Sequence, residues 1–430
     1  MRVKPRDRQA SVRERLASVA QAAATGQHPS MRRLLPFMLL ALAGCRQQPL
    51  NPAPPPPPPE IGYAWVTFGP NGIRGSGASG LADRAQGRPI TIDDPVRVAS
   101  VSKLVVALGV MRLVEQGRLD LDEDVSKRLC WEMRNPRFPQ VPITLRLLLS
   151  HRSSFKDDNE AYVIPLGKSL RQALAEPAAM DAEHAPGTYF RYSNLNFPVI
   201  ASVMEGTTGE RFDRLMDRLV LGPLGLDACF NWTTCSPAKI DRGVTLYNSD
   251  GSFRKDDPDA RRAKCQVSSL SPECDIGSYV LGSNGALFSP QGGLRISARD
   301  LAKVGQLLLN RGRHDGKPFL TEASVEAVMK PAWRYNGSNG DTSEGFYCAY
   351  GLATQSLASP ITGCRDDLFG SGRQVIGHAG EAYGVLSGLW IDPRRRTGIA
   401  YFSTNNPVKP APGQSSYGAV EEWLAAKLRD

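Results

Sequence analysis

The sequence has no second long apolar segment after its first fifty residues, no C-x-x-C pair among its eight cysteines, and only five scattered histidines. A zinc site needs clustered Cys and His ligands, so we expect no metal. The formal net charge is +9, but +6 of it lies in residues 1 to 44, which leaves +3 for the rest of the chain. Because that remainder has no basic stripe, we expect no nucleic-acid partner.

The segment Met31 to Cys45 reads MRRLLPFMLLALAGC, in which two arginines precede a short apolar run and small residues. This pattern predicts a signal peptide over residues 31–44. The run is shorter than the about 20 residues that a membrane-spanning helix needs, so cleavage is expected. The ending Leu42 to Cys45 resembles a bacterial lipobox, which implies lipidation of Cys45 and a periplasmic protein anchored to the membrane. The alternative is a buried or disulfide-bonded Cys45.

The remaining chain divides by composition. Residues 1–30 precede the signal, and we interpret them as a non-native start or a disordered extension, with translation beginning at Met31. Residues 45–60 contain a polyproline run and predict a semi-rigid, lipid-anchored tether. Residues 61–430 form the expected folded domain. Within it we expect an α/β part at about 61–115 and 290–430 and a helical part at about 116–289.

Local patterns give an α+β fold, an antiparallel β-sheet flanked by helices. Residues 61–69 and 72–80 predict two strands, and 385–404 predict a hairpin around a basic turn. Helical spacing over 95–117 ends at Gly117. Ser297 and Asp300 have capping-box spacing, and residues 416–430 predict an amphipathic helix.

The cysteines suit an oxidising compartment. If Cys45 is lipidated, seven remain and one lacks an intramolecular partner. Cys130 is then left over, and we interpret it as a buried small hydrophobe. Sequence proximity favours three disulfides, although sequence alone leaves the connectivity open: Cys229–Cys235, Cys265–Cys274 and Cys348–Cys364.

Ser100 and Lys103 form an S-x-x-K pair at the start of the helix predicted over 95–117. Residues three apart share a helix face, so the amine can reach the hydroxyl and activate it as a nucleophile. The helix N-terminus and the Ser100 amide would stabilise an oxyanion. The motif alone is weak, because it recurs at 153–156, 236–239 and 252–255. The alternative for Ser100 is a simple helix cap.

Two further motifs could complete a site. Tyr192 and Asn194 form the chain's Y-x-N, and a tyrosine near Lys103 could relay protons. His378 and Gly380 form an H-x-G just before the predicted hairpin, where a strand could reach the substrate. The same spacing at 314–316 is more simply a turn, because Asp-Gly favours one.

These motifs, in order, resemble class C β-lactamases and related penicillin-recognising serine hydrolases over roughly residues 61–430. The similar segments are VASVSKLVVALGVMRLVEQGRLDLDEDV, ITLRLLLSHRSSF, PGTYFRYSN, GERFDRLMDRLVLGPLGL, GGLRISARDLAKVGQLLLN and HAGEAYG. The resemblance implies a β-lactamase/transpeptidase-like fold, with a sheet flanked by helices, an all-helical subdomain and an active site between them.

The resemblance also implies roles. Ser100 would become acylated, and Lys103 and Tyr192 would handle its proton. Asn194 would hold the substrate or the lysine. His378 would stand where many members have lysine, and Gly380 and Glu381 would line the substrate strand, with the Glu381 amide in the oxyanion hole. No metal or organic cofactor would be required.

The chain also departs from its relatives. Where many of them read H-T-S-G-L, it has His151, Arg152, Ser153, Ser154 and Phe155, without the glycine. His378 in place of lysine weakens the case for binding a β-lactam carboxylate. Structural roles remain alternatives for Tyr192, Asn194 and His378, and we expect His151 to be structural.

The sequence thus predicts a serine hydrolase that acts through an acyl-enzyme on a D-alanyl peptide, a β-lactam or a small ester in the cell envelope. Its partners would be a small-molecule or peptidoglycan-derived substrate and the membrane, through lipidated Cys45. The alternative is a catalytically silent or slowly deacylating penicillin-binding lipoprotein.

Overall fold

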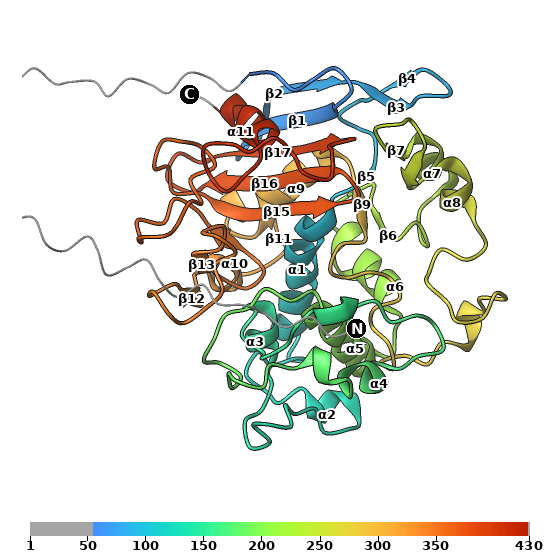
Figure 1. The fold of residues 1–430 in the computed structure, drawn as a ribbon, viewed down its shortest axis with the longest axis vertical. Helices are drawn as coiled ribbons and strands as arrows, with labels where there is room; N and C mark the ends of the chain where they lie inside the picture. Colours follow the sequence, from blue (N-terminus) through green and yellow to red (C-terminus); the bar gives the residue numbers. More distant parts are fainter. Residues whose placement is uncertain (1–54, 429–430) are drawn as a thin grey trace, which may run out of the picture. The chain divides into compact units, whose positions relative to one another are not determined.

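A computed structural model describes residues 55–428, so the predicted signal peptide, Cys45 and most of the tether lie outside the described residues. Its largest element is an antiparallel sheet of eight strands in the order β12-β13-β14-β15-β16-β17-β1-β2 (Figure 1). The strands are β12 (Trp333–Arg334), β13 (Ala349–Tyr350), β14 (Gln355–Ser356), β15 (Ile376–Ala382), β16 (Val385–Asp392), β17 (Thr397–Thr404), β1 (Gly62–Gly69) and β2 (Gly72–Ser79).

The middle of this sheet joins the two ends of the folded domain. β16 and β17 form the predicted hairpin around the basic turn, and every residue of β16 is buried, as in a strand covered on both faces. β1 pairs antiparallel with β17, from Gly62 opposite Thr404 to Phe68 opposite Gly398. The first and last strands therefore lie side by side, which confirms the antiparallel sheet expected from sequence.

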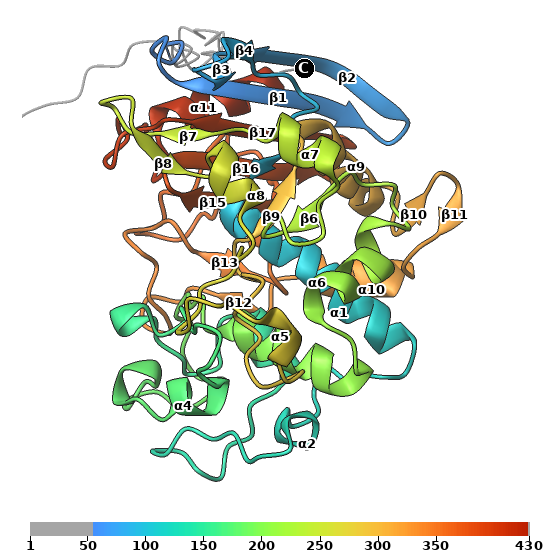
Figure 2. The same ribbon diagram turned by 90° about the vertical axis from the view of Figure 1, so that its right-hand side faces the viewer.

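Helices cover both faces of the sheet (Figures 1 and 2). On one face lies α9 (Ala298–Leu309), and Ser297 caps it by accepting from the Asp300 amide at 3.1 Å, as its spacing predicts. At Gly305 an added Cβ would lie 2.2 Å from the Phe68 ring, so glycine permits this close packing. On the other face lie α11 (Ala419–Ala425) and η6 (Ala426–Leu428), packed in a separate apolar cluster around Trp390.

The helical middle of the chain packs around α1 (Ser102–Glu115). Every residue of α1 from Ser102 to Met111 is buried, so this helix is covered on all sides and runs through the core. α5 (Asn196–Thr208) is buried over its first ten residues and ends at Gly209 in a left-handed turn. The other helices in this region are α2 (Ser126–Leu129), α3 (Leu145–Leu149), η2 (Asp158–Glu160), α4 (Leu170–Leu174), η3 (Pro177–Ala179), α6 (Phe212–Met216), η4 (Asp217–Leu221), α7 (Pro237–Arg242), α8 (Pro258–Arg262) and η5 (Ile276–Ser278).

Short strands complete the fold. A three-stranded sheet in the order β5-β9-β6 lies beside the start of α1 and includes β5 (Val96–Arg97) and β9 (Leu294–Ile296). The expected turn at residues 314–316 joins β10 to β11, and α10 follows. The remaining bounds are β3 (Leu81–Asp83), β4 (Arg88–Pro89), β6 (Cys229–Phe230), β7 (Leu246–Tyr247), β8 (Phe253–Lys255), β10 (Arg313–His314), β11 (Lys317–Pro318) and α10 (Glu322–Met329).

All three expected disulfides are present, and Cys130 is a free cysteine. The prediction that Cys130 is buried is wrong. It follows the last residue of α2 with a φ of +57°, and its side chain is exposed because this short helix ends at the surface. Within residues 55–428, no helix is long and apolar enough to cross a membrane, and no group of three or more His, Cys, Asp or Glu side chains could hold a metal ion.

Candidate active site

Ser100 lies in the 3-10 helix η1 (Ala99–Val101), directly before α1. Ala99 has a φ of +44°, a strained conformation for a residue with a Cβ. The Ser102 hydroxyl holds this turn, since it donates to the Ala99 carbonyl at 2.6 Å and accepts from the Leu294 amide of β9 at 3.1 Å. The nucleophile candidate is therefore fixed at a strained helix start by side-chain and backbone contacts.

Lys103 is fully buried and lies within hydrogen-bond distance of three oxygen atoms. Its Nζ is 2.9 Å from Ser100 Oγ, 2.8 Å from Asn194 Oδ1 and 2.7 Å from the Gln291 carbonyl oxygen. A carbonyl or amide oxygen can only accept, so the side-chain oxygen of Asn194 and the backbone oxygen of Gln291 each accept one N–H of Lys103. In a neutral amine, the lone pair then points at the Ser100 hydroxyl, which is the arrangement a general base requires.

Burial lowers the pKa of Lys103 to about 7, with the negative charge of Asp157 opposing the shift. Near neutral pH a large share of the amine is therefore unprotonated, unlike a lysine in water. The geometry and the proton affinity of Lys103 together give Ser100 a base within reach.

Tyr192 lies over the same amine, with Lys103 Nζ 5.0 Å from its ring centroid. The ring stacks between His151, at 4.3 Å between centroids, and Tyr347, at 4.8 Å. Burial raises the pKa of its hydroxyl above the usual value, with the Ser100 side chain opposing the shift. The hydroxyl thus stays protonated near Ser100 and can donate a proton or receive one in exchange.

Strand β15 passes close to the nucleophile. A Cβ at Gly380 would lie 2.4 Å from the Val98 carbonyl oxygen and 3.0 Å from the Ser100 amide nitrogen, so a side chain here would clash with the backbone of this turn. Glu381 follows, is exposed, and lines the space on both sides of Ser100. The oxyanion role of its amide stays a prediction.

His378 is a buried residue of this strand and does not line the space near Ser100. Its Nε2 accepts from the Tyr350 hydroxyl at 2.8 Å, and its Nδ1 faces the Ala379 carbonyl. Burial and the nearby charge of Lys103 lower its pKa to about 3, so the imidazole is neutral. Both ring nitrogens have protein partners, and the predicted contact between His378 and substrate finds no support in this geometry.

The departure at the His151–Phe155 segment places a serine at a left-handed backbone position. Ser154 stands where many relatives have glycine and adopts a φ of +69°, a conformation that normally favours glycine. Its hydroxyl donates to the His184 carbonyl at 2.6 Å and accepts from Asn135 Nδ2 at 2.7 Å. These bonds support the strained serine, so the sequence change alone is a weak argument for lost turnover.

His151 has the structural position expected for it. It is buried, its Nδ1 accepts from the Ser193 amide at 3.0 Å, and its ring supports Tyr192. Sequence reasoning missed two other groups, the Gln291 carbonyl and the Asp157 carboxylate. A backbone carbonyl leaves no residue-type signal, and Asp157 lies in an ordinary polar run, KDDN.

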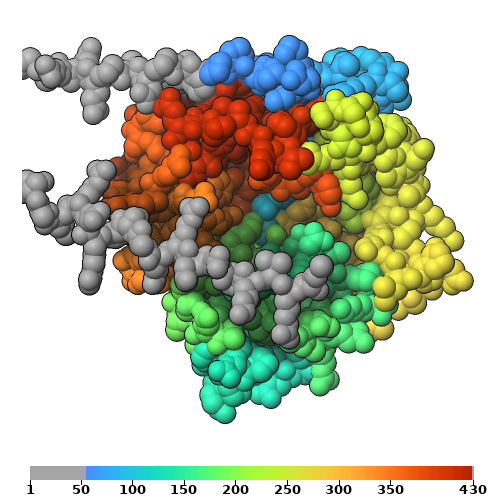
Figure 3. All heavy atoms as spheres, in the orientation of Figure 1, coloured from blue at the N-terminus to red at the C-terminus, as the bar shows by residue number. Residues whose placement is uncertain are grey.

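Two cavities open on either side of Ser100. The first has a volume of about 800 Å³ and is lined by Asn231, Gln266 and Tyr383 among others. The second has a volume of about 650 Å³ and is lined by Tyr192, Tyr347 and Arg365 among others. Ser100 and Asn194 line both cavities. In Figure 3 a patch coloured for residues near 100 is visible at the bottom of a hollow between the C-terminal segments and the helical middle.

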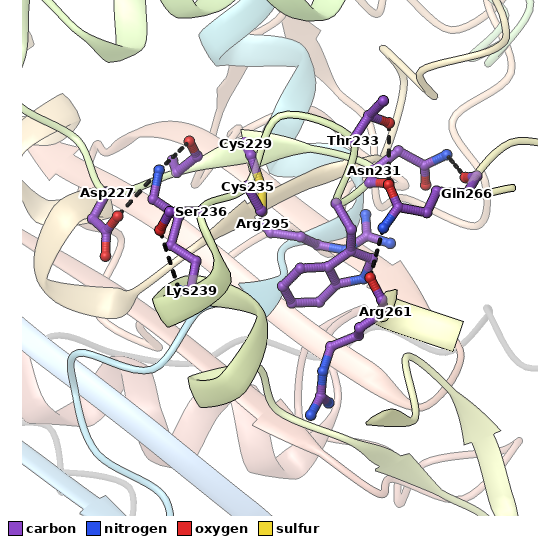
Figure 4. Close-up of a disulfide and its surroundings, with 12 residues drawn as sticks. Asp227, Cys229, Asn231, Thr233, Cys235, Ser236, Lys239, Arg261, Gln266 and Arg295 are labelled. Carbon is purple, nitrogen blue, oxygen red and sulfur yellow. Dashed lines mark hydrogen bonds and ion pairs between the residues drawn. A yellow bond between two sulfur atoms is a disulfide. The ribbon is translucent and has the colours of Figure 1, made fainter. Parts of the chain in front are cut away.

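Loops closed by disulfides wall the first cavity. The loop of Cys229–Cys235 supplies Asn231, and that of Cys265–Cys274 supplies Gln266. Asn231 Nδ2 donates to the Gln266 carbonyl at 2.6 Å and so ties the two loops together (Figure 4). The third disulfide, Cys348–Cys364, is flanked by the second-cavity residues Tyr347 and Arg365.

A buried ionic cluster forms part of the lining of the first cavity. Asp256 accepts from Arg97 Nε at 3.0 Å, from Arg295 Nη2 at 2.9 Å and from Trp232 Nε1 at 2.9 Å. Burial opposes ionisation, but the two guanidinium groups hold the pKa of Asp256 well below its usual range. Through Asp256 the cluster connects Arg97 of β5, Arg295 of β9 and Trp232 of the disulfide-closed loop. Strand pairing adds to this connection, because Cys229 of β6 lies opposite Arg295 of β9.

Curated proteins with similar sequences include hydrolases. The chain is 35% identical over 172 residues to esterase EstB of Burkholderia gladioli, covering 35% of this chain and 42% of that protein. It is 23% identical over 326 residues to penicillin-binding protein 4* of Bacillus subtilis, covering 74% and 62%. It is 28% identical over 144 residues to the D-alanyl-D-alanine-carboxypeptidase/endopeptidase AmpH of Escherichia coli, covering 31% and 36%. In each case the match spans less than two thirds of the relative.

Solved structures confirm the fold. The octameric penicillin-binding protein homologue from Pyrococcus abyssi matches with a TM-score of 0.59 and 19% identity, over 86% of this chain and 72% of that one. The D-amino acid amidase from Ochrobactrum anthropi SV3, complexed with L-phenylalanine, matches with a TM-score of 0.59 and 21% identity, over 85% and 93%. The family model named Beta-lactamase matches residues 14–419. With its sheet, its helices and its ordered motifs, the chain belongs to the beta-lactamase family.

Proposed function

We propose that this protein is a serine hydrolase that forms an acyl-enzyme on Ser100 from an ester or amide carbonyl. The observation that carries the proposal is the buried Lys103 amine, 2.9 Å from Ser100 Oγ, with a pKa lowered to about 7. A serine hydroxyl becomes nucleophilic when such a base accepts its proton during attack.

The residues give the following sequence of steps. Neutral Lys103 takes the proton of Ser100 as Oγ attacks the carbonyl carbon, and the carbonyl π electrons move to oxygen. The N-terminus of α1 and the Ser100 amide stabilise this oxyanion. As the carbonyl re-forms, the bond to the leaving alcohol or amine breaks, and the leaving group receives the proton from Lys103 directly or through Tyr192. Water then attacks the ester on Ser100, giving a carboxylic acid and the free serine.

Small esters and D-alanyl peptides are the substrate classes we favour. The similarity to an esterase and to a D-alanyl carboxypeptidase supports them. The neutral, enclosed His378 offers no positive charge for a substrate carboxylate, whether that of a β-lactam or that of a terminal D-alanine, so we place the small ester first. We further propose that the protein acts in the cell envelope as a lipoprotein anchored through Cys45. Three disulfides support an oxidising compartment.

Intact-mass spectrometry of the purified full-length chain, exposed briefly to a reactive penicillin and to a p-nitrophenyl ester, tests the proposal. We expect an adduct or product release with the wild type and neither with Ser100→Ala. A stable penicillin adduct without turnover would instead identify a slowly deacylating penicillin-binding lipoprotein. Equal behaviour of wild type and variant with both reagents would remove Ser100 from the mechanism.

A further inference from the structure

The Asp157 carboxylate receives four hydrogen bonds from the turn that carries the Y-x-N motif. Its Oδ1 accepts from the Ser193 hydroxyl at 2.7 Å and from the Leu195 amide at 3.1 Å. Its Oδ2 accepts from the Asn194 amide at 2.7 Å and from Asn194 Nδ2 at 2.9 Å. One carboxylate thus holds three consecutive residues of this turn.

These bonds determine which end of the Asn194 amide faces Lys103. An ionised carboxylate can only accept, so it must face the NH₂ end of the amide. The oxygen end then points away from Asp157, where Asn194 Oδ1 accepts from Lys103 Nζ at 2.8 Å. If the amide were reversed, two N–H donors would face a lysine that has no acceptor when protonated. Asp157 therefore orients the side-chain amide of Asn194, whose oxygen accepts one N–H of Lys103.

Asp157 also acts on Lys103 through its charge. It raises the pKa of Lys103 against the larger lowering by burial. The other titratable groups near this amine are His151, His378 and Tyr192. Burial, with the charge of Lys103, lowers the pKa of both histidines, and burial raises that of Tyr192, so all three are neutral near pH 7. Among the described residues, Asp157 is the carboxylate whose charge acts on the amine.

We propose that Asp157 is a positioning residue for acyl transfer, which holds Asn194 with its amide oxygen on Lys103 and places one negative charge opposite that amine. The inference rests on the proposed function of Ser100. Asp157 touches neither Ser100 nor the space where a substrate carbonyl would lie, so it acts through Asn194 and Lys103.

The test compares the pH dependence of ester turnover in four full-length proteins: the wild type, Asp157→Asn, Asp157→Glu and Asp158→Asn. Asp158 is the matched control, because it is adjacent and exposed, and pairs with Lys156 at 2.5 Å. With Asp157→Asn we expect kcat at neutral pH to fall about 10- to 100-fold, the loss typical of a charged hydrogen bond. The midpoint of the acid limb should move to lower pH, because the amine loses its anion, and KM should change little.

Asp157→Glu keeps the charge but displaces the oxygens. We expect it to keep the wild-type midpoint with a reduced kcat, and Asp158→Asn to match the wild type throughout. An unshifted midpoint in Asp157→Asn, or full kcat in either Asp157 variant, would overturn the inference. Should Asp157→Asn fail to fold by circular dichroism, the kcat and midpoint of Asp157→Glu decide.

Adduct formation by the wild type distinguishes failure of the proposed function from failure of the proposed role of Asp157. If it forms no serine-dependent adduct, the proposed function fails. If it does form one and the Asp157 variants behave like Asp158→Asn, only the role of Asp157 fails.

Discussion

The proposed catalytic floor, which we define as Ser100, Lys103, Tyr192 and Asn194, lies in segments without a disulfide, whereas two disulfides close the loops that wall the first cavity. The third disulfide, Cys348–Cys364, lies next to residues that line the second cavity. The floor is held by the buried helix α1, by β15 and by hydrogen bonds to Asp157 and Gln291. The walls are less completely buried: Trp232 and Val267 are buried, but Leu270, within the Cys265–Cys274 loop, is 67% exposed.

The difference follows from burial. A segment that buries apolar side chains on all sides is fixed by packing, and even a lysine can be kept there if its donors are satisfied. A loop without a regular helix or sheet loses more conformational entropy on ordering than its contacts return, and a disulfide reduces that loss in the unfolded chain. We therefore expect changes in the floor to affect the chemical step, and changes in the walls to affect substrate binding and stability.

The largest effect should come from removing the base. Lys103→Met keeps most of the side-chain volume but has no amine, so we expect ester turnover to fall by about 1000-fold or more. Thermal stability should stay equal or rise, because burial disfavours the charged amine that the variant lacks. Stopped-flow acylation and a thermal melt measure the two effects. Lys239→Met is the control, because Lys239 belongs to the chance S-x-x-K at 236–239, and this substitution should leave turnover unchanged. If Lys239→Met lost as much turnover as Lys103→Met, the assignment of Lys103 as the base would be contradicted.

Next comes the pH dependence of the wild-type floor. In the proposed mechanism activity requires neutral Lys103, whose pKa burial lowers to about 7. Acylation should therefore rise about tenfold per pH unit below that value and level off above it. A rate profile from pH 5 to 9 with a p-nitrophenyl ester checks this. If the rate rose with a midpoint at pH 9 or above, the amine of Lys103 would not be desolvated as the structure indicates. Burial would then not explain the difference between floor and walls.

A smaller effect is expected from removing the disulfide of one wall loop, Cys265–Cys274. In the double variant Cys265→Ser and Cys274→Ser, we expect unfolding free energy to drop by about 2–3 kcal/mol, as for a short disulfide loop. KM should rise several-fold while kcat stays within about threefold, because the loop lines the first cavity and does not touch Lys103. Steady-state kinetics and urea unfolding give both values. A fall in kcat with unchanged KM would show that the walls position the chemistry after all.

The smallest effect should follow Cys130→Ser. Cys130 is exposed at the end of α2 and belongs to neither region. We expect stability within about 0.5 kcal/mol of the wild type and unchanged kinetics. The same urea and ester assays apply, and a clear loss in either would reveal a contact of Cys130 that the free, exposed side chain does not suggest.

Much of the floor could be read from sequence because it depends on local spacing. Ser100 and Lys103 are three residues apart at a helix start, and that spacing allows the amine to reach the hydroxyl. The other ordered motifs distinguish this S-x-x-K from its three recurrences. The hairpin of β16 and β17 and the three short-range disulfides are local in the same sense. Cys130 was mispredicted because exposure depends on where a four-residue helix ends, and composition does not determine that.

The sequence by itself determined the S-x-x-K pair and the order of the motifs, predicted the antiparallel sheet and favoured the three disulfide pairings, since each follows from periodicity, spacing or proximity along the chain. Only the tertiary structure decided that Asp157 reaches Asn194 across 37 residues, that Gln291 occupies a donor of Lys103, and that His378 turns to Tyr350 and not to the cavities. These contacts join segments far apart in the chain, and burial, which sets the proton affinity of Lys103, exists only once those segments pack together.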